Sequence, residues 1–218
     1  MKKILDLKDL QNHLKHCFEN NLPGMDAHMS IAPLHRKSEI KDAELRKNAI
    51  KSSVLILFYE KENEPHIVFI RRPDYNGVHS GQISFPGGRW EMTDKSLYHT
   101  ALRESREEIG VNTHKVMYSG KLTDLYIPPS NYLVSPYVAI YDGGCRFEPD
   151  PAEVAEIIEV PFLFFFKASA LKNVNILVRG TESLNTPAFV YNNNIIWGAT
   201  AMILNELIVS LKNVKNEE

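Results

Sequence analysis

The chain has 218 residues, 44% hydrophobic and 24% charged, which fits one large domain or a domain with an added helical arm. Its formal net charge of −2 argues against a broad nucleic-acid-binding surface, and Cys17 and Cys145 lack the spacing of a zinc site or disulfide framework. Because it shows neither the apolar core of a signal peptide nor about 20 consecutive apolar residues, we expect a soluble cytoplasmic protein without a membrane partner.

The first part of the chain is predicted to be partly helical. Apolar residues recur at helical spacing over residues 4–20, which indicates an amphipathic helix. Residues 22–41 contain breakers at Pro23-Gly24 and Pro33 and are predicted to be irregular. Residues 42–51 are expected to form a short helical or linking piece.

A hairpin and one long helix follow. Residues 54–59 and 67–70 are apolar runs of strand length joined by a charged turn at 60–65, which predicts a hairpin. A helix is expected from about residue 96 to residue 109, because Gly110 suits the left-handed position after a helix. The remaining expected elements are a loop at 71–80, an extended piece at 82–85, strands at 116–122, 132–141 and 157–160, a helix at 162–170, β-rich segments at 175–179 and 189–191, and a last helix at 199–211.

This order of elements predicts an α/β or α+β fold, in which a mixed sheet carries helices on its faces. We expect a helical arm over residues 1–48 that packs on a domain over residues 49–218. The first and last helices could also support a homodimer.

The helix before Gly110 carries an unusual charge pattern. Its core face holds Tyr98, Ala101, Leu102, Ser105 and Ile109, at helical spacing. The neighbouring face collects three glutamates in the last two turns, where they repel one another and oppose the helix dipole. A solvated acidic patch is one interpretation of this face. The other is a site for a divalent cation, since Mg²⁺ prefers carboxylate oxygens.

The residues before this helix favour the second interpretation. Paired glycines in Phe85-Pro86-Gly87-Gly88 allow backbone to approach a ligand closely and leave amides and carbonyls free for metal or phosphate. With the helix, they form the pattern Gly88-x5-Asp94-x8-Arg103-Glu104-x2-Glu107-Glu108-x-Gly110-Val111. This pattern resembles the Nudix box, although Asp94 replaces a glutamate with one extra residue before Arg103, and Ser105 replaces an apolar residue.

The resemblance implies a Nudix fold and the hydrolysis of a nucleotide diphosphate link with Mg²⁺ or Mn²⁺ as cofactor. The metal ligands would be Glu104, Glu107, Glu108 and the carbonyl of Gly88, and Arg103 would orient the glutamates. The water's proton would pass to Glu104 or to an acid from a later loop. Glu153 is the candidate for that acid, and a plain surface acid is the alternative for it.

The flanks of the box resemble the coenzyme A diphosphatase branch of the family. Arg72, Gly81 and residues 85–88 match that branch's motif in register, whereas Gly77 stands where it has a second arginine and Pro73 where it has a serine. Further likeness lies at residues 100–104, 128–136 and 197–201.

This second resemblance implies coenzyme A as the substrate and 3′,5′-ADP and 4′-phosphopantetheine as products. Coenzyme A carries an additional 3′-phosphate, so extra cations are expected; Arg71 and Arg72 are the candidates, beside the Gly87-Gly88 loop. A solvated strand end is the alternative for the arginine pair. Two other functions stay open: hydrolysis of another nucleoside diphosphate derivative, such as ADP-ribose or a dinucleoside polyphosphate, and a Nudix module that senses a nucleotide without cleaving it.

Overall fold

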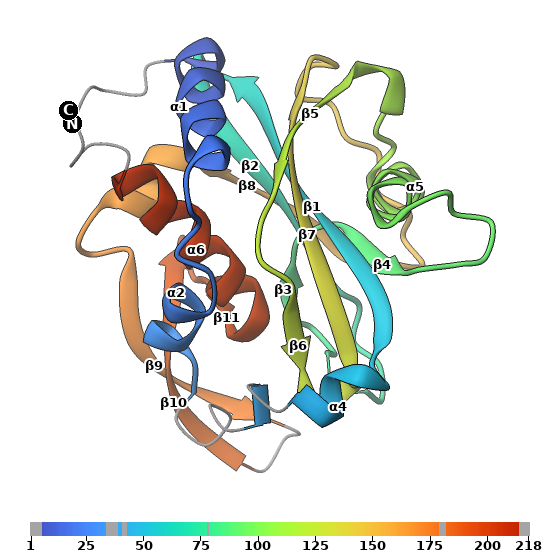
Figure 1. The fold of residues 1–218 in the computed structure, drawn as a ribbon, viewed down its shortest axis with the longest axis vertical. Coiled ribbons are helices and arrows are strands. Elements are labelled where there is room, and N and C mark those ends of the chain that lie inside the picture. Colours follow the sequence, from blue (N-terminus) through green and yellow to red (C-terminus); the bar gives the residue numbers. More distant parts are fainter. Residues whose placement is uncertain (1–5, 34–38, 41–42, 78, 179–181, 214–218) are drawn as a thin grey trace.

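The computed structural model describes residues 6–33, 39–40, 43–77, 79–178 and 182–213. In Figure 1 the helix α5 (Leu97–Ile109) lies on one face of a large sheet. The helices α1 (Leu7–Glu19), α2 (Gly24–Ile31) and α6 (Gly198–Asn213) lie on the other side. The predicted mixed sheet with helices on both faces is confirmed.

The large sheet is mixed because its two central strands run parallel. Its order is β3-β2-β1-β7-β5, with β4 paired to β1, β6 to β7 and β8 to β2. The β1–β7 pair is parallel and the other pairs are antiparallel. The strands are β1 (Ile50–Lys61), β2 (Glu64–Arg71), β3 (Ile83–Ser84), β4 (Gly87–Arg89), β5 (Val116–Lys121), β6 (Leu125–Ile127), β7 (Tyr132–Tyr141) and β8 (Glu156–Pro161).

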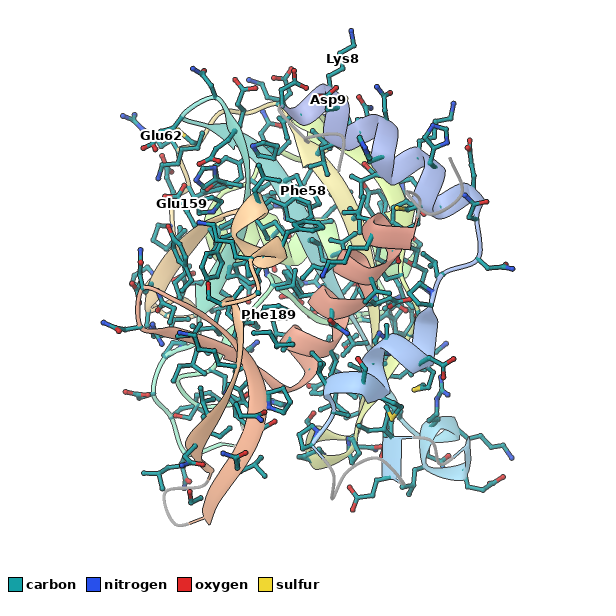
Figure 2. All side chains as sticks on the ribbon, turned by 90° about the vertical axis from the view of Figure 1, so that its left-hand side faces the viewer. Lys8, Asp9, Phe58, Glu62, Glu159 and Phe189 are labelled. Carbon is teal, nitrogen blue, oxygen red and sulfur yellow. The ribbon has the colours of Figure 1, made fainter. Side chains whose placement is uncertain are left out.

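The central strand β1 is covered on both faces, which explains its continuous run of apolar residues. Leu55 and Leu57 face the cluster that packs under α5, whereas Ile56 and Phe58 face the cluster shared with α1, α2 and α6. Side chains alternate across a strand, so a strand covered on both faces has no polar side. Figure 2 shows Phe58 and Phe189 in the interior, while Glu62 lies at the periphery.

The β1–β2 hairpin is confirmed, but its turn is shorter than predicted. Strand pairing continues to Lys61 and Glu64, so the turn comprises only Glu62 and Asn63. Both have positive φ, 55° and 60°. Positive φ at both positions is typical of a two-residue hairpin turn whose twist matches the flanking strands. The charged residues on either side of the turn are therefore part of the strands.

The N-terminal helices agree in part with the prediction. The first helix is confirmed over α1, and residues 4–5 of the predicted range lie outside the described residues. The prediction of an irregular stretch is wrong for α2, which begins immediately after Pro23. Proline is tolerated at the start of a helix because no intrahelical donor is needed there. A short helix, α4 (Ala43–Lys47), then leads into β1.

The C-terminal part contains a second sheet in the order β11-β10-β9. The predicted helix at 162–170 is wrong beyond a 3₁₀ helix, η4 (Phe162–Phe166). Phe162 and Phe165 are buried in the core, and the other three residues of η4 are partly buried against it. The strands are β9 (Leu171–Val178), β10 (Glu182–Tyr191) and β11 (Asn194–Trp197). Residue 179, the end of the first predicted β-rich segment, lies outside the described residues, and the last helix is confirmed as α6.

A buried polar contact joins α2 to α6. The His28 Nε2 lies 2.8 Å from Glu206 Oε2, and both side chains are fully buried. The backbone N–H of Thr123 donates to the same carboxylate. A fully buried contact therefore joins the N-terminal segment to the last helix. None of the helices described is long and apolar enough to cross a membrane.

Candidate functional site

The helix α5 is fixed at both ends by its own sequence. The Ser96 hydroxyl accepts a hydrogen bond from the His99 N–H at the N-terminus, and Gly110 takes the left-handed conformation, φ 71°, at the C-terminus. Ala101, Ser105 and Ile109 are buried against the sheet, and Tyr98 and Leu102 pack at the edge of this cluster. The predicted core face is confirmed, so the glutamates must lie on another side of the helix.

Three acids meet at that side. Carboxylate oxygens of Glu104, Glu108 and Glu153 lie within 4.8 Å of one another. Only 2% of Glu108 is exposed, and 14% of the Glu104 side chain. Such proximity is costly for three like charges unless a cation or a proton compensates. This acidic triad, as we call these three residues, is thus more than a solvated patch.

The loop between β7 and β8 brings Glu153 to the helix. The N–H groups of Glu148 and Asp150 donate to the carbonyls of Ile109 and Glu108, at 3.1 and 3.0 Å. The last carbonyls of a helix have no intrahelical partner, so this loop satisfies them while it closes over the helix end. On its far side the Ala155 N–H donates to the Arg71 carbonyl at 2.9 Å. The loop is held on both sides of Glu153.

The glycine loop contacts the triad directly. The Gly87 N–H donates to Glu108 Oε2 at 2.7 Å. Gly87 has φ 149°, and a Cβ there would lie 2.2 Å from the Ser53 carbonyl oxygen. A Cβ on Gly88 would lie 2.5 Å from Glu104 Cδ. Both glycines are therefore required by close approach, Gly87 to strand β1 and Gly88 to the Glu104 carboxylate.

Arg103 is the centre of a second network. Its guanidinium lies 3.0 Å from Asp94 Oδ1, 2.9 Å from Glu104 Oε1 and 3.0 Å from Glu107 Oε2. It also donates to the Arg89 carbonyl. Asp94, only 5% exposed, accepts from both Nε and Nη2 of Arg103, and this guanidinium lowers the pKa of its carboxyl. Asp94 thus holds Arg103 in place, and Arg103 holds the glutamates.

Glu107 stands apart from the triad. Its side chain is 44% exposed and accepts from Arg103 Nη1. Of the four predicted metal-binding positions, the structure brings Glu104 and Glu108 together and places Gly88 against Glu104. The same cluster also contains Glu153, which was predicted as a proton acceptor.

Burial and neighbouring carboxylates disfavour the charged forms of Glu108 and Glu104. Burial is the main cause that raises the pKa of Glu108 to about 8; the Gly87 N–H and Arg72 oppose this rise, and Glu104 and Glu153 add to it. Burial also raises the pKa of Glu104, against the opposing effect of Arg103. A divalent cation among these oxygens would remove this penalty.

A cavity of about 370 Å³ opens over the triad. Arg72 and Arg89 line it with the Gly87-Gly88 loop. One side is closed by Trp197 at the end of β11 and Thr200 in the first turn of α6. Arg71 does not line this cavity. Its Nε donates to Glu156 at 2.8 Å and its Nη2 to Asn194 at 2.5 Å.

Comparison with known proteins decides the family. The family model described as NUDIX domain matches residues 49–176, more than half of the chain. The chain belongs to the Nudix family. The Nudix hydrolases act on phosphoric anhydrides, and this chain is an enzyme of that class.

Relatives with the same family name align over most of their length. A protein of Photorhabdus laumondii described as "Uncharacterized Nudix hydrolase NudL" is 35% identical over 144 residues, which cover 66% of this chain and 76% of the relative. A protein of Yersinia pestis with the same description is 36% identical over 146 residues, covering 66% and 71%. The solved structure of a MutT protein from Methanosarcina mazei Go1 is 17% identical with a TM-score of 0.46, covering 77% of this chain and 94% of that one. The coenzyme A branch stays a prediction.

The residues of this Nudix site fit a divalent cation. Nudix enzymes generally use such ions, and hard cations prefer carboxylate oxygens, which the triad supplies from two elements. Gly88 leaves room beside Glu104 that any other residue would fill.

Sequence reasoning did not assign three features of the site. Arg89 and Trp197 line the cavity without having been singled out, although residues 197–201 had shown likeness to the coenzyme A branch. The role of Asp94 was also unassigned, because the extra residue before Arg103 obscured its register with the box. Its contact with Arg103 could have been suspected from the strict preference of arginine for carboxylate partners.

Proposed function

We propose that this Nudix hydrolase cleaves the diphosphate of coenzyme A or its derivatives to 3′,5′-ADP and 4′-phosphopantetheine. The observation that carries the proposal is the cavity in which the acidic triad, the Gly87-Gly88 loop and two arginines, Arg72 and Arg89, face one space. The arginines supply positive charge for a substrate with three phosphate groups, and the flanking motif matches the coenzyme A branch at Arg72 and residues 85–88.

Mg²⁺ or Mn²⁺ would neutralise the diphosphate and lower the pKa of a bound water. We propose Glu104, Glu108 and the Gly88 carbonyl as ligands, and Glu107 as a further ligand on the strength of the box pattern. In the structure Glu107 is bonded to Arg103, so it must exchange partners to serve in this way. Arg103 orients Glu104 through their 2.9 Å contact.

The proton acceptor is proposed to be Glu153. Its carboxylate lines the cavity beside two other acids, and hydrogen bonds on both sides of Glu153 hold its loop at the end of α5. The water oxygen forms a bond to one phosphorus, the anhydride bond to the bridging oxygen breaks, and one water proton passes to the carboxylate. Glu104 is the second candidate for this role. Arg72 is proposed to bind a phosphate, and Arg71, already engaged by Glu156, is not given a phosphate contact.

A product assay tests the function. The purified protein is incubated with coenzyme A and either Mg²⁺ or Mn²⁺, and the two expected products are separated and quantified. Parallel kcat/KM values for ADP-ribose and a dinucleoside polyphosphate decide specificity, because discrimination is a ratio of such values. A preference of tenfold or more for ADP-ribose would contradict the proposal. Saturable nucleotide binding without any turnover would indicate a sensing module instead.

Variants of the acids test the assigned roles. Glu108→Gln and Glu104→Gln should each weaken Mn²⁺ binding and lower kcat by two or more orders of magnitude. Glu153→Gln should lower kcat by about 10²-fold to 10⁴-fold with little change in Mn²⁺ affinity. If Glu153→Gln instead abolishes Mn²⁺ binding, Glu153 is a ligand and Glu104 becomes the proton acceptor.

A further inference from the structure

A second cavity adjoins the first. It has a volume of about 880 Å³ and lies between the segment after β2 and the small β9–β11 sheet. Of its described lining residues, Asn76, Ser80, Asn175 and Asn193 offer neutral hydrogen-bonding groups, while Ile176, Leu177 and Ile195 offer aliphatic surface. Arg71 also lines this cavity, but the role expected for it was a phosphate contact; the residues of the small sheet in the lining have no role in the function described above.

The two cavities share a wall. Tyr75, Gln82 and Trp197 line both of them. A ligand whose phosphates lie at the triad could therefore continue past these three side chains into the second space. The small sheet, attached to the start of α6 through β11, forms the far side of this extended site.

Charge separates the two cavities. The first is lined by arginines and glutamates, as a phosphate and metal site requires. Among the described residues that line the second, Arg71 is the one with a full charge, and its guanidinium is paired with Glu156 and bonded to Asn194. A phosphate would find no unbalanced cation there. A neutral ligand with amide groups and methylenes would find partners for both.

An exposed leucine fits the same interpretation. Leu177 on β9 is 72% exposed, the second largest exposure among the large apolar residues described. It lines the second cavity together with Ile176 and Ile195. Apolar side chains in a concave, polar-rimmed space commonly contact a ligand.

We propose that the second cavity binds the uncharged, amide-bearing arm of the substrate while the first cavity holds its diphosphate. The identification of that arm as pantetheine rests on the proposed function. The side-chain amides of Asn175 and Asn193 pair with the arm's peptide-like groups, and Leu177 covers its methylenes. The small β9–β11 sheet then selects substrates by the group that the diphosphate carries on the side away from the nucleoside.

Leu177→Asp tests the proposal in the full-length enzyme. A carboxylate at this position should raise KM for coenzyme A about tenfold or more, since an unpaired charge against a methylene chain must lose its water. The kcat value and the kcat/KM for ADP-ribose should stay within twofold. The matched control is Leu171→Asp on the same strand, 38% exposed and outside the lining of both cavities, which should leave both substrates unaffected.

A binding measurement separates this inference from the proposed function. Pantetheine, the arm alone, is titrated into methyl-labelled protein in the presence of a chelator, so that no hydrolysis is involved. Signals of Ile176, Leu177 and Ile195 should shift in a saturable manner, and Leu177→Asp should abolish the shifts. If coenzyme A is not hydrolysed but these shifts occur, the proposed function fails and the arm site stands. If coenzyme A is hydrolysed while pantetheine leaves all three signals unchanged, or if Leu177→Asp affects both substrates equally, the arm site is wrong.

Discussion

Replacing Gly88 by alanine perturbs the active site at one atom. The added Cβ would lie 2.5 Å from Glu104 Cδ and 2.6 Å from both of its carboxylate oxygens. Carbon atoms in contact normally keep about 3.5 Å or more, so the carboxylate must retreat by roughly 1 Å. Gly88 is not among the glycines with positive φ, so its backbone accepts alanine without strain.

The displacement should act on catalysis and not on folding. The contacted atoms are the end of a flexible side chain, and moving them costs little stability. A shift of about 1 Å in a positioned group can cost about 10²-fold in rate, which corresponds to about 2.7 kcal/mol of transition-state stabilisation. We therefore expect Gly88→Ala to lower kcat for the preferred diphosphate substrate by about 10²-fold, with a melting temperature within a few degrees of the wild type.

Two further variants serve as controls. Gly144→Ala adds a Cβ that meets nothing within 4 Å, at φ 81°, so it should lower stability by about 1 kcal/mol through backbone strain and leave kcat unchanged. Glu104→Asp shortens the displaced side chain, so Gly88→Ala should cost much less in that background. Additive losses in the double variant, or wild-type kcat for Gly88→Ala, would refute the assigned contact.

Three more outcomes are expected. Asp94→Asn should lower kcat about tenfold, or about 1.4 kcal/mol, because it removes the negative charge and one of the two acceptor oxygens that hold Arg103. Kinetics at saturating Mn²⁺ measure this, and wild-type activity would show that Asp94 does not position Arg103. The folded-state pKa of Glu108, about 8, exceeds its unfolded value, so in the presence of a chelator the protein should lose stability as pH rises from about 4.5 to about 8. Glu108→Gln should reduce this dependence of the unfolding free energy on pH, as measured by urea titration. An unchanged pH dependence would contradict the pKa assignment. His28→Ala should lower stability by roughly 3 kcal/mol because the buried Glu206 carboxylate loses its side-chain partner and keeps the Thr123 N–H. Calorimetry should show a lower melting temperature, while kcat/KM is retained.

The sequence alone identified the site helix and its chemistry. Helical periodicity predicted the core face of α5, and Gly110 predicted where the helix ends. The ordered spacing from Gly88 to Glu108 indicated the family. These features are local, because capping and amphipathicity depend on residues a few positions apart. The mixed sheet was predicted from the order of the strand-like and helical segments along the chain.

Other parts needed the tertiary structure. The short helix α2 and the single 3₁₀ turn at η4 are set by packing against α6 and the sheet, which outweighs weak local preference. Prediction placed Glu153 near the site only by family likeness, and the two hydrogen bonds of its loop to the end of α5 supply the physical reason.

What the sequence determined about this protein is the set of chemical groups it brings to a diphosphate: glutamates, a glycine loop and arginines in a fixed order. What only the fold decided is which of them meet. Glu153 joins Glu104 and Glu108, whereas Glu107 and Arg71 turn to other partners. The spacing of residues along a helix fixes the direction in which each side chain points. Contacts between distant segments depend instead on the hydrogen bonds that hold the loops between strands. The residues that make those bonds are spread over the whole chain.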